Sequence, residues 1–156
     1  MKAMAFKIKN YTTSVPVAQS ISEIEQILVT FGATQIMKEY RGDGRVESLV
    51  FMFKGTGYKL PANVERVCAV VTKGKNIHSK ATWEKQAERI AWRVIKDWIH
   101  SQLSIVEIDQ AEWQQVLLPY AFNGEKTLYE VLQERKNGIA GLLGEPIKQN
   151  VKEGES

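Results

Sequence analysis

The stretch that decides the fold is TWEKQAERIAWRVIKDWIHSQLSIVEI, residues 82–108. Apolar side chains recur in it at three- and four-residue spacings, which is the period of an amphipathic helix. These side chains are Ala87, Ile90, Ala91, Val94, Ile95, Trp98 and Ile99. A helix of this length spans roughly 40 Å at a rise of 1.5 Å per residue. We therefore expect one long amphipathic helix, capped near Thr82, with its apolar side buried.

The residues before this helix are typical of a small antiparallel sheet with one helix. Phe6–Thr12 alternates apolar and polar side chains, which predicts a first strand. Ser20–Glu23 reads as a capping box and predicts a helix that ends at Gly32. Thr34–Tyr40 and Val46–Lys54 then predict a β-hairpin.

The hairpin turn is predicted at Asp43-Gly44, and Tyr58–Leu60 predicts one further short strand. A short helix is predicted over residues 62–72, and capping boxes at Asp109–Glu112 and Thr127–Glu130 predict two more. The order is strand, helix, strand, strand, then helices. It predicts an α+β fold, with residues 1–136 as a single domain and residues 137–156 as a flexible tail.

Composition favours a soluble intracellular protein. With 156 residues, 44% of them apolar, the chain is long enough to bury roughly 70% of its unfolded surface. Cys68 is the single cysteine, so an intramolecular disulfide is excluded and a reducing compartment is expected. The sequence has no membrane-length apolar run and no recognisable signal peptide at its start. We expect a cytoplasmic protein without a membrane partner.

Charge is distributed unevenly along the chain. Residues 54–100 hold ten Lys or Arg against four Asp or Glu, a net charge of +6. Residues 1–53 carry +1 and residues 101–156 carry −4. A basic middle segment favours a surface that faces a polyanion, although an ordinary solvated face is the alternative.

A cationic stripe follows the predicted long helix. Its members recur at spacings of four, four, three and four residues, and basic loop residues precede it. The stripe consists of Lys85, Arg89, Arg93, Lys96 and His100, with Trp92 beside it and Lys73, Lys75 and Lys80 before it. Such a stripe can follow a phosphate backbone and neutralise several charges. The alternative for the same residues is a solvated face, partly neutralised by Glu84 and Glu88.

Aromatic side chains on the predicted sheet are interleaved with lysines. Tyr11, Tyr40 and Tyr58 are the candidates for stacking on bases, with Lys54 and Lys59 close in sequence. Phe51 and Phe53 share a strand face with Leu49, so we assign them to the core instead.

Motifs for catalysis are missing. The two histidines, His78 and His100, have no second ligand at metal spacing, and the sequence lacks a P-loop and a nucleophile elbow. We therefore expect no metal, no cofactor and no enzyme activity. Scattered carboxylates leave a metal-dependent nuclease open as a minor alternative; they include Glu23, Glu39, Glu47 and Asp97.

Several short motifs are shared with a known family. They are Asn10-Tyr-Thr-Thr13 with Val15-Pro16, Leu60-Pro-Ala-Asn-Val-Glu65, QAERIAWRVIKDW at residues 86–98, and Leu118-Pro-Tyr120. Over about residues 9–132 the chain resembles uncharacterised small proteins of bacteriophages, prophages and mobile elements. Genes of this kind accompany replication and recombination functions. The resemblance thus implies a phage or mobile-element context in a bacterial host cell and favours DNA binding.

Two hypotheses of function follow. The first is a non-enzymatic, sequence-tolerant protein that binds single-stranded DNA or RNA, and it forms a homo-oligomer. No helix-turn-helix or zinc-finger pattern is present, which favours single strands over duplex. The second is a regulatory module that binds a protein partner through the basic helix or through Gly138–Pro146.

Overall fold

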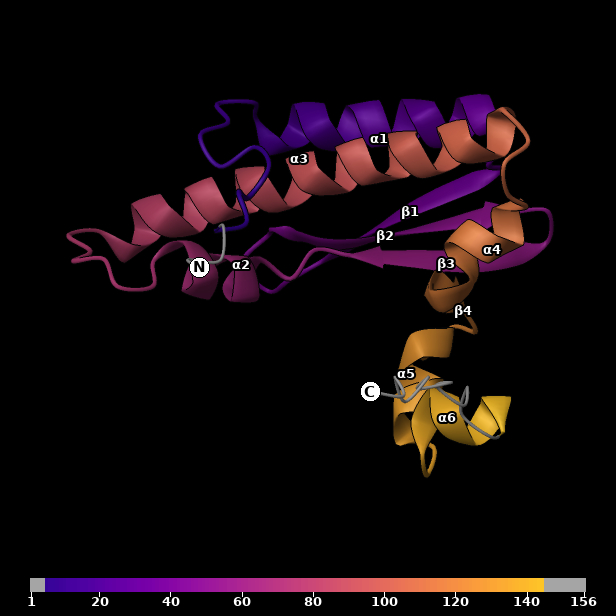
Figure 1. Ribbon diagram of the computed structural model, residues 1–156. Coiled ribbons are helices and arrows are strands. Elements are labelled where there is room, and N and C mark those ends of the chain that lie inside the picture. The colour runs from indigo at the N-terminus through magenta and orange to yellow at the C-terminus, as the bar shows by residue number, and fades with distance from the viewer. Residues whose placement is uncertain (1–4, 145–156) are drawn as a thin grey trace, which may run out of the picture.

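The computed structural model describes residues 5–144, and it has the predicted α+β fold (Figure 1). The sheet is antiparallel throughout, with its four strands in the order β1-β2-β3-β4. The strands are β1 (Gln35–Tyr40), β2 (Val46–Phe53), β3 (Thr56–Pro61) and β4 (Ala121–Phe122). The hairpin and the further short strand are therefore confirmed. The tight turn of the β1–β2 hairpin is closed by the Gly44 amide, which donates to the Arg41 carbonyl at 3.0 Å.

Two helices cover one face of this sheet, α1 (Val17–Phe31) and α3 (Lys80–Glu107), lying side by side in Figure 1. The predicted long helix is thus confirmed, and its apolar side faces the sheet. Alternate residues of β2 point toward the helices, because side chains in a strand alternate between faces. The buried core includes Leu49, Phe51, Phe53, Tyr58 and Leu60 from the sheet, with Ile24, Leu28, Ala87, Trp92 and Ile99 from the helices.

The start of α1 differs from the predicted capping box. The helix begins at Val17, with Pro16 as N-cap and no side-chain cap. Proline's fixed φ suits the residue at a helix start, so the chain enters the helix one turn early. Ser20 is consequently buried inside the helix. The predicted end is confirmed, since Gly32 has φ 122°, which is strained for any residue with a Cβ.

The strand predicted over Phe6–Thr12 is wrong. These residues form an irregular segment with a turn, in which the Thr13 amide donates to the Asn10 carbonyl. Asn10 donates to Asp97 of α3 at 2.9 Å, and Lys9 forms an ion pair with the same carboxylate at 3.0 Å. A short alternating pattern becomes a strand only where a partner strand accepts its hydrogen bonds, and this segment bonds to α3 instead.

Five short helical segments complete the described part of the chain, residues 5–144. They are α2 (Val64–Val71), α4 (Trp113–Leu117), the 3-10 helix η1 (Leu118–Tyr120), α5 (Leu128–Glu134) and α6 (Gly138–Leu143). Thr127 and Glu130 form the predicted capping box of α5. The box predicted at Asp109–Glu112 is displaced, because Glu112 itself is the N-cap of α4 and Gln115 bonds back to it.

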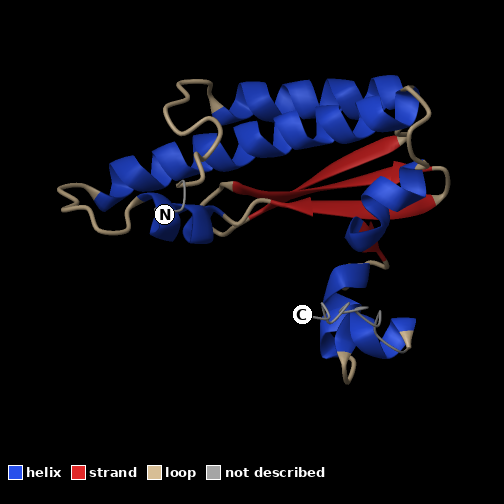
Figure 2. Cartoon of the chain, in the orientation of Figure 1, coloured by secondary structure: helices blue, strands red, loops and turns tan. Residues whose placement is uncertain are grey.

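Helices α5 and α6 lie below the sheet in this view, away from the layer that α1 and α3 form (Figure 2). The prediction that regular structure ends after residue 136 is wrong for Gly138–Leu143, which forms α6. The rest of the predicted tail, residues 145–156, lies outside the described residues.

Candidate nucleic-acid interface

A lysine held between two aromatic rings marks one end of the molecule. Lys75 lies in the loop between α2 and α3, and its Nζ is 4.7 Å from the ring centre of Tyr11 and 4.5 Å from that of Trp83. The same Nζ donates to the Tyr11 hydroxyl. Contacts of a cation with ring faces are attractive because the faces carry partial negative charge. The loop, the N-terminal segment and the start of α3 therefore meet at Lys75.

Gln86 fixes the N-terminal segment to α3 at this point. Its Nε2 donates to the carbonyl oxygens of Tyr11 at 3.2 Å and Thr13 at 3.0 Å. Arg89, almost one helical turn further on, donates to Oε1 of Gln86 at 3.2 Å. A single side chain thus connects the aromatic pair to the next cation along the helix.

We call this group the basic cluster: Tyr11, Lys73, Lys75, Trp83, Lys85 and Arg89. Lys73 is exposed in the same loop, and Lys85 lies one turn before Arg89 on the same helix face. Among the described residues, none of these four cations forms an ion pair with a carboxylate. The cluster therefore offers positive charge that the protein itself does not neutralise, beside two half-exposed aromatic rings.

Arg93 and Lys96, in the second half of the cationic stripe, lie against carboxylates of the protein itself. Arg93 forms an ion pair with Glu23 of α1, and Lys96 lies 3.6 Å from the Asp97 carboxylate. Both cationic side chains are only 18% exposed. The Arg93 guanidinium, by hydrogen bonding to it, holds the pKa of Glu23 below its usual range. The predicted stripe is therefore not continuously exposed beyond Arg89, because α1 packs along α3 at Arg93, although His100 at its end is exposed.

Two predicted contact residues are buried. Trp92 has no exposed surface and Tyr58 is 3% exposed, so neither reaches a ligand. Tyr58 stacks on Phe51 at 5.4 Å and meets the edge of Trp113. Both assignments were wrong, since these side chains point into the space between the sheet and α3, where burial of aromatic area is favourable. Trp113, at the start of α4, packs against the same core.

Two further predicted contact residues, Lys54 and Tyr40, lie away from the basic cluster. Lys54 lies in the β2–β3 turn, at the other end of the sheet from the hairpin tip, over the rings of Phe53 and Trp113. Tyr40 is 61% exposed at the end of β1 and lines a shallow groove with α1. Neither residue makes a contact with the cluster.

Lys59 belongs to a polar group that connects three strands. Its Nζ is 2.8 Å from Oε2 of Glu39 on β1, and Ser48 on β2 donates to the same oxygen. Lys59 and Ser48 together hold the pKa of Glu39 below its usual range. Lys59 therefore forms an ion pair that links strands of the sheet. We do not assign it to the candidate interface.

We expect acid to weaken the sheet through Glu39. Because its pKa is lower in the folded protein, its contribution to stability is present above the unfolded pKa, about 4.3, and is lost as the pH falls through the lower folded value. Glu39→Gln should lower the free energy of unfolding at neutral pH, and the difference from the natural protein should disappear in acid. Urea unfolding at several pH values measures this. Glu47→Gln, at an exposed position on β2, is the control; an identical pH profile for both variants would contradict the assignment.

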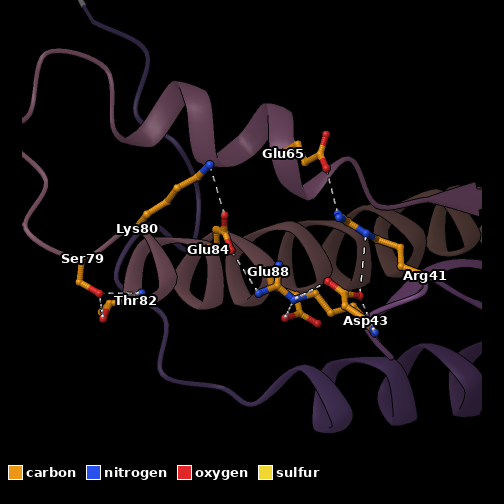
Figure 3. A network of polar contacts seen from close by, with 9 residues as sticks. Arg41, Asp43, Glu65, Ser79, Lys80, Thr82, Glu84 and Glu88 are labelled. Carbon is orange, nitrogen blue, oxygen red and sulfur yellow. Dashed lines mark hydrogen bonds and ion pairs between the residues drawn. The ribbon is translucent and has the colours of Figure 1, made fainter.

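A network of ion pairs lies next to the basic cluster, between the hairpin tip, α2 and α3 (Figure 3). Arg41 is 3.1 Å from Glu65, and Arg45 is 3.5 Å from Glu84. Lys80, a predicted contact residue, lies 3.8 Å from Glu84 and is 83% exposed. Lys80 thus stands between the network and the cluster, and its charge is partly neutralised.

Trp83 belongs to the basic cluster, although the sequence pattern did not single it out. Trp83 lies in the first turn of α3, where the helix extends past the sheet and packs against α2 (Figure 1). The available signal was its place directly after the Lys-rich loop of residues 73–80. The arginines of the hairpin tip were missed as well, because only the fold brings them to α3.

No helix within residues 5–144 combines the length and apolar composition that crossing a bilayer requires. Over the same residues, no three His, Cys, Asp or Glu side chains gather in a metal-binding arrangement. Comparison of the chain with protein-family models, with curated proteins and with solved structures finds no match.

Proposed function

We propose that the protein binds single-stranded nucleic acid, DNA in the first place, through the basic cluster, without catalysing a reaction on it. The observation that carries the proposal is Lys75, held between the rings of Tyr11 and Trp83. Cations without carboxylate partners attract phosphates, and neighbouring aromatic rings accept unpaired bases by stacking. The resemblance to phage and mobile-element proteins supports the same choice.

The state of Lys75 suggests how a strand is accepted. Without a ligand, the ammonium group lies over the Trp83 ring, where a base would stack, and donates to the Tyr11 hydroxyl. A stacked base displaces it, and the freed ammonium then pairs with the adjoining phosphate. Because duplex bases keep their faces buried in their own stack, this exchange requires an unpaired strand.

Salt dependence tests the proposal. The affinity for a labelled strand of about 16 nucleotides, measured by fluorescence anisotropy, should fall steeply as salt rises. With all four cluster cations engaged, the slope of log K against log salt should be about −3, since each neutralised phosphate contributes roughly −0.7 on single strands. A duplex of the same length should bind more weakly. Absence of binding at low salt would overturn the proposal, as would cleavage of the probe with added magnesium.

A second candidate function, protein interaction, rests on α6. Ile139 is 53% exposed, Leu142 59% and Leu143 76%. Large apolar side chains left in water on a surface helix favour association, and the same face of a second copy can cover them.

We therefore expect self-association that depends on α6. Leu142→Ser combined with Leu143→Ser should reduce the mass measured by light scattering to that of a monomer. Leu118→Ser is the matched control, because Leu118 is 52% exposed on η1 rather than on α6. Equal masses for all three proteins would exclude this interface.

A further inference from the structure

A cleft opens beside the basic cluster, between the hairpin tip, α2 and the first turns of α3. Its volume is about 560 Å³, which lies in the range of roughly 300–1,000 Å³ typical of small-molecule sites. Its apolar lining comes from α2, the loop and α3, and consists of Val64, Cys68, Ala69, Ile77 and Trp83. A flat, partly apolar ligand fits such walls.

The polar side of this cleft is a set of loosely paired charges. Asp43 Oδ2 is 3.7 Å from Nε of Arg45, and Glu84 Oε2 is 3.5 Å from its Nη2. Arg41 lies 3.9 Å from Asp43. Arg45 Nε also lies 3.7 Å from Glu88, while the Arg45 amide donates to Asp43 at 3.2 Å and Arg41 is 3.1 Å from Glu65. An N–H···O hydrogen bond is ordinarily about 2.7–3.2 Å long, so the contacts of the Arg45 guanidinium are long, and a ligand with closer acceptors can compete for it. Figure 3 shows Arg41, Asp43 and Glu84 converging on this place from the hairpin and α3.

The arrangement of charges matches one base. Guanine presents two acceptors, O6 and N7, which an arginine contacts with two hydrogen bonds. Its N1–H and N2 amino group, on the adjoining Watson–Crick edge, are donors from which a carboxylate accepts hydrogen bonds. Adenine, cytosine and thymine each lack part of this pattern. We propose that the cleft binds guanine, with Arg45 on O6 and N7, and Asp43 or Glu84 on the donor edge.

The inference rests in part on the proposed function, because Trp83 lines the cleft and is also a member of the basic cluster. A strand that stacks on Trp83 can direct an unpaired guanine into the cleft. A free guanine nucleotide presents the same base, so the experiment has one arm for each source.

The first arm compares oligonucleotides. A strand of about 16 thymidines with one central guanine should bind about tenfold more tightly than strands with adenine or cytosine there. Arg45→Gln and Asp43→Asn should each abolish this preference while binding of the all-thymidine strand persists. Arg66→Gln is the matched control, since Arg66 is exposed on α2 and does not line this cleft.

The second arm uses guanosine monophosphate alone. Cys68 is half-exposed on the cleft wall, so its rate of reaction with a thiol reagent reports occupancy. Guanosine monophosphate should slow the reaction and raise the melting temperature, whereas adenosine monophosphate should do neither. Asp43→Asn should remove both effects.

The outcomes separate this inference from the proposed function. Salt-sensitive binding of the thymidine strand with no guanine preference, and no effect of the nucleotide, would overturn the guanine site and leave the basic cluster's function intact. Effects of guanosine monophosphate without any strand binding would support the site and overturn the proposed function. A guanine preference that survives in both Arg45→Gln and Asp43→Asn would also overturn the assignment to this cleft.

Discussion

Replacing Lys75 and Arg89 together by glutamate is expected to weaken binding of a single strand by about 100-fold. In the proposed interface each residue supplies a charged contact to a phosphate, and a hydrogen bond to a charged group contributes roughly 1.5 kcal/mol or more. Loss of two such contacts corresponds to about two orders of magnitude in affinity. The substituted carboxylates add repulsion from the strand, so this figure is a lower bound.

Stability is expected to change little in this double variant. Lys75 is exposed, and Arg89 is half-buried with Gln86 as its hydrogen-bond partner rather than a carboxylate. Circular dichroism and a thermal melt check that the variant is folded. An unaltered melt with lost affinity assigns the effect to the interface.

The control variant must change the net charge by the same amount as the Lys75 and Arg89 double variant, at positions outside the basic cluster. Lys54→Glu with Lys126→Glu meets this condition, because both lysines are exposed and lie outside the basic cluster. The ion pair of Lys126 with Glu134 is on the surface, where such pairs contribute little. If the control weakens binding as much as the cluster variant does, the attraction comes from net charge and not from the cluster.

Local patterns predicted the elements that depend on local interactions. Helical periodicity predicted α3, and the turn residues between two β-type runs predicted the β1–β2 hairpin. These features hold because side chains three or four residues apart share a helix face and because turn geometry determines strand pairing. The segment Phe6–Thr12 was mispredicted for the converse reason. Its hydrogen bonds go to α3, which lies far along the chain.

The residues of the candidate site divide in the same way, into those that local spacing predicts and those that only tertiary packing brings together. Spacing along α3 correctly places Lys85 and Arg89 on one face, but it cannot reveal that α1 packs beside Arg93 and pairs Glu23 with it. The meeting of Lys75 with Tyr11 joins residues 64 positions apart, and only tertiary folding creates it. Sequence therefore indicated the chemistry of the interface, while its members depend on how helices and loops pack.

Trp92→Ala is expected to destabilise the protein by about 3–5 kcal/mol, a far larger loss of stability than the surface substitutions at the basic cluster should cause. The indole has no exposed surface and belongs to the core shared by the sheet and the helix layer. Truncation removes its buried area and leaves a cavity that the surrounding side chains fill only in part. Because domains of this size are stable by only about 5–15 kcal/mol, the variant should unfold at much lower urea concentration or temperature.

Trp92→Phe separates packing from any role of the indole N–H. Among the described residues, the Trp92 Nε1 atom is buried without a hydrogen-bond partner. Phenylalanine keeps most of the apolar area and removes this unpaired donor, whose burial costs roughly 1–3 kcal/mol. Its loss of stability should therefore be well below that of Trp92→Ala, and equal losses would contradict the unpaired-donor argument.

Trp83 and Trp92, both on α3, should respond in opposite ways, because Trp92 is buried and Trp83 lies at the basic cluster. Trp92→Phe should leave strand affinity unchanged. Trp83→Ala should reduce it by about tenfold, a typical loss for one stacked base, while the melting temperature changes less than in Trp92→Ala. Anisotropy titrations and thermal melts on the same preparations measure both quantities. If Trp92→Phe loses affinity and Trp83→Ala does not, bases do not stack at the basic cluster, and the interface lies elsewhere on the protein.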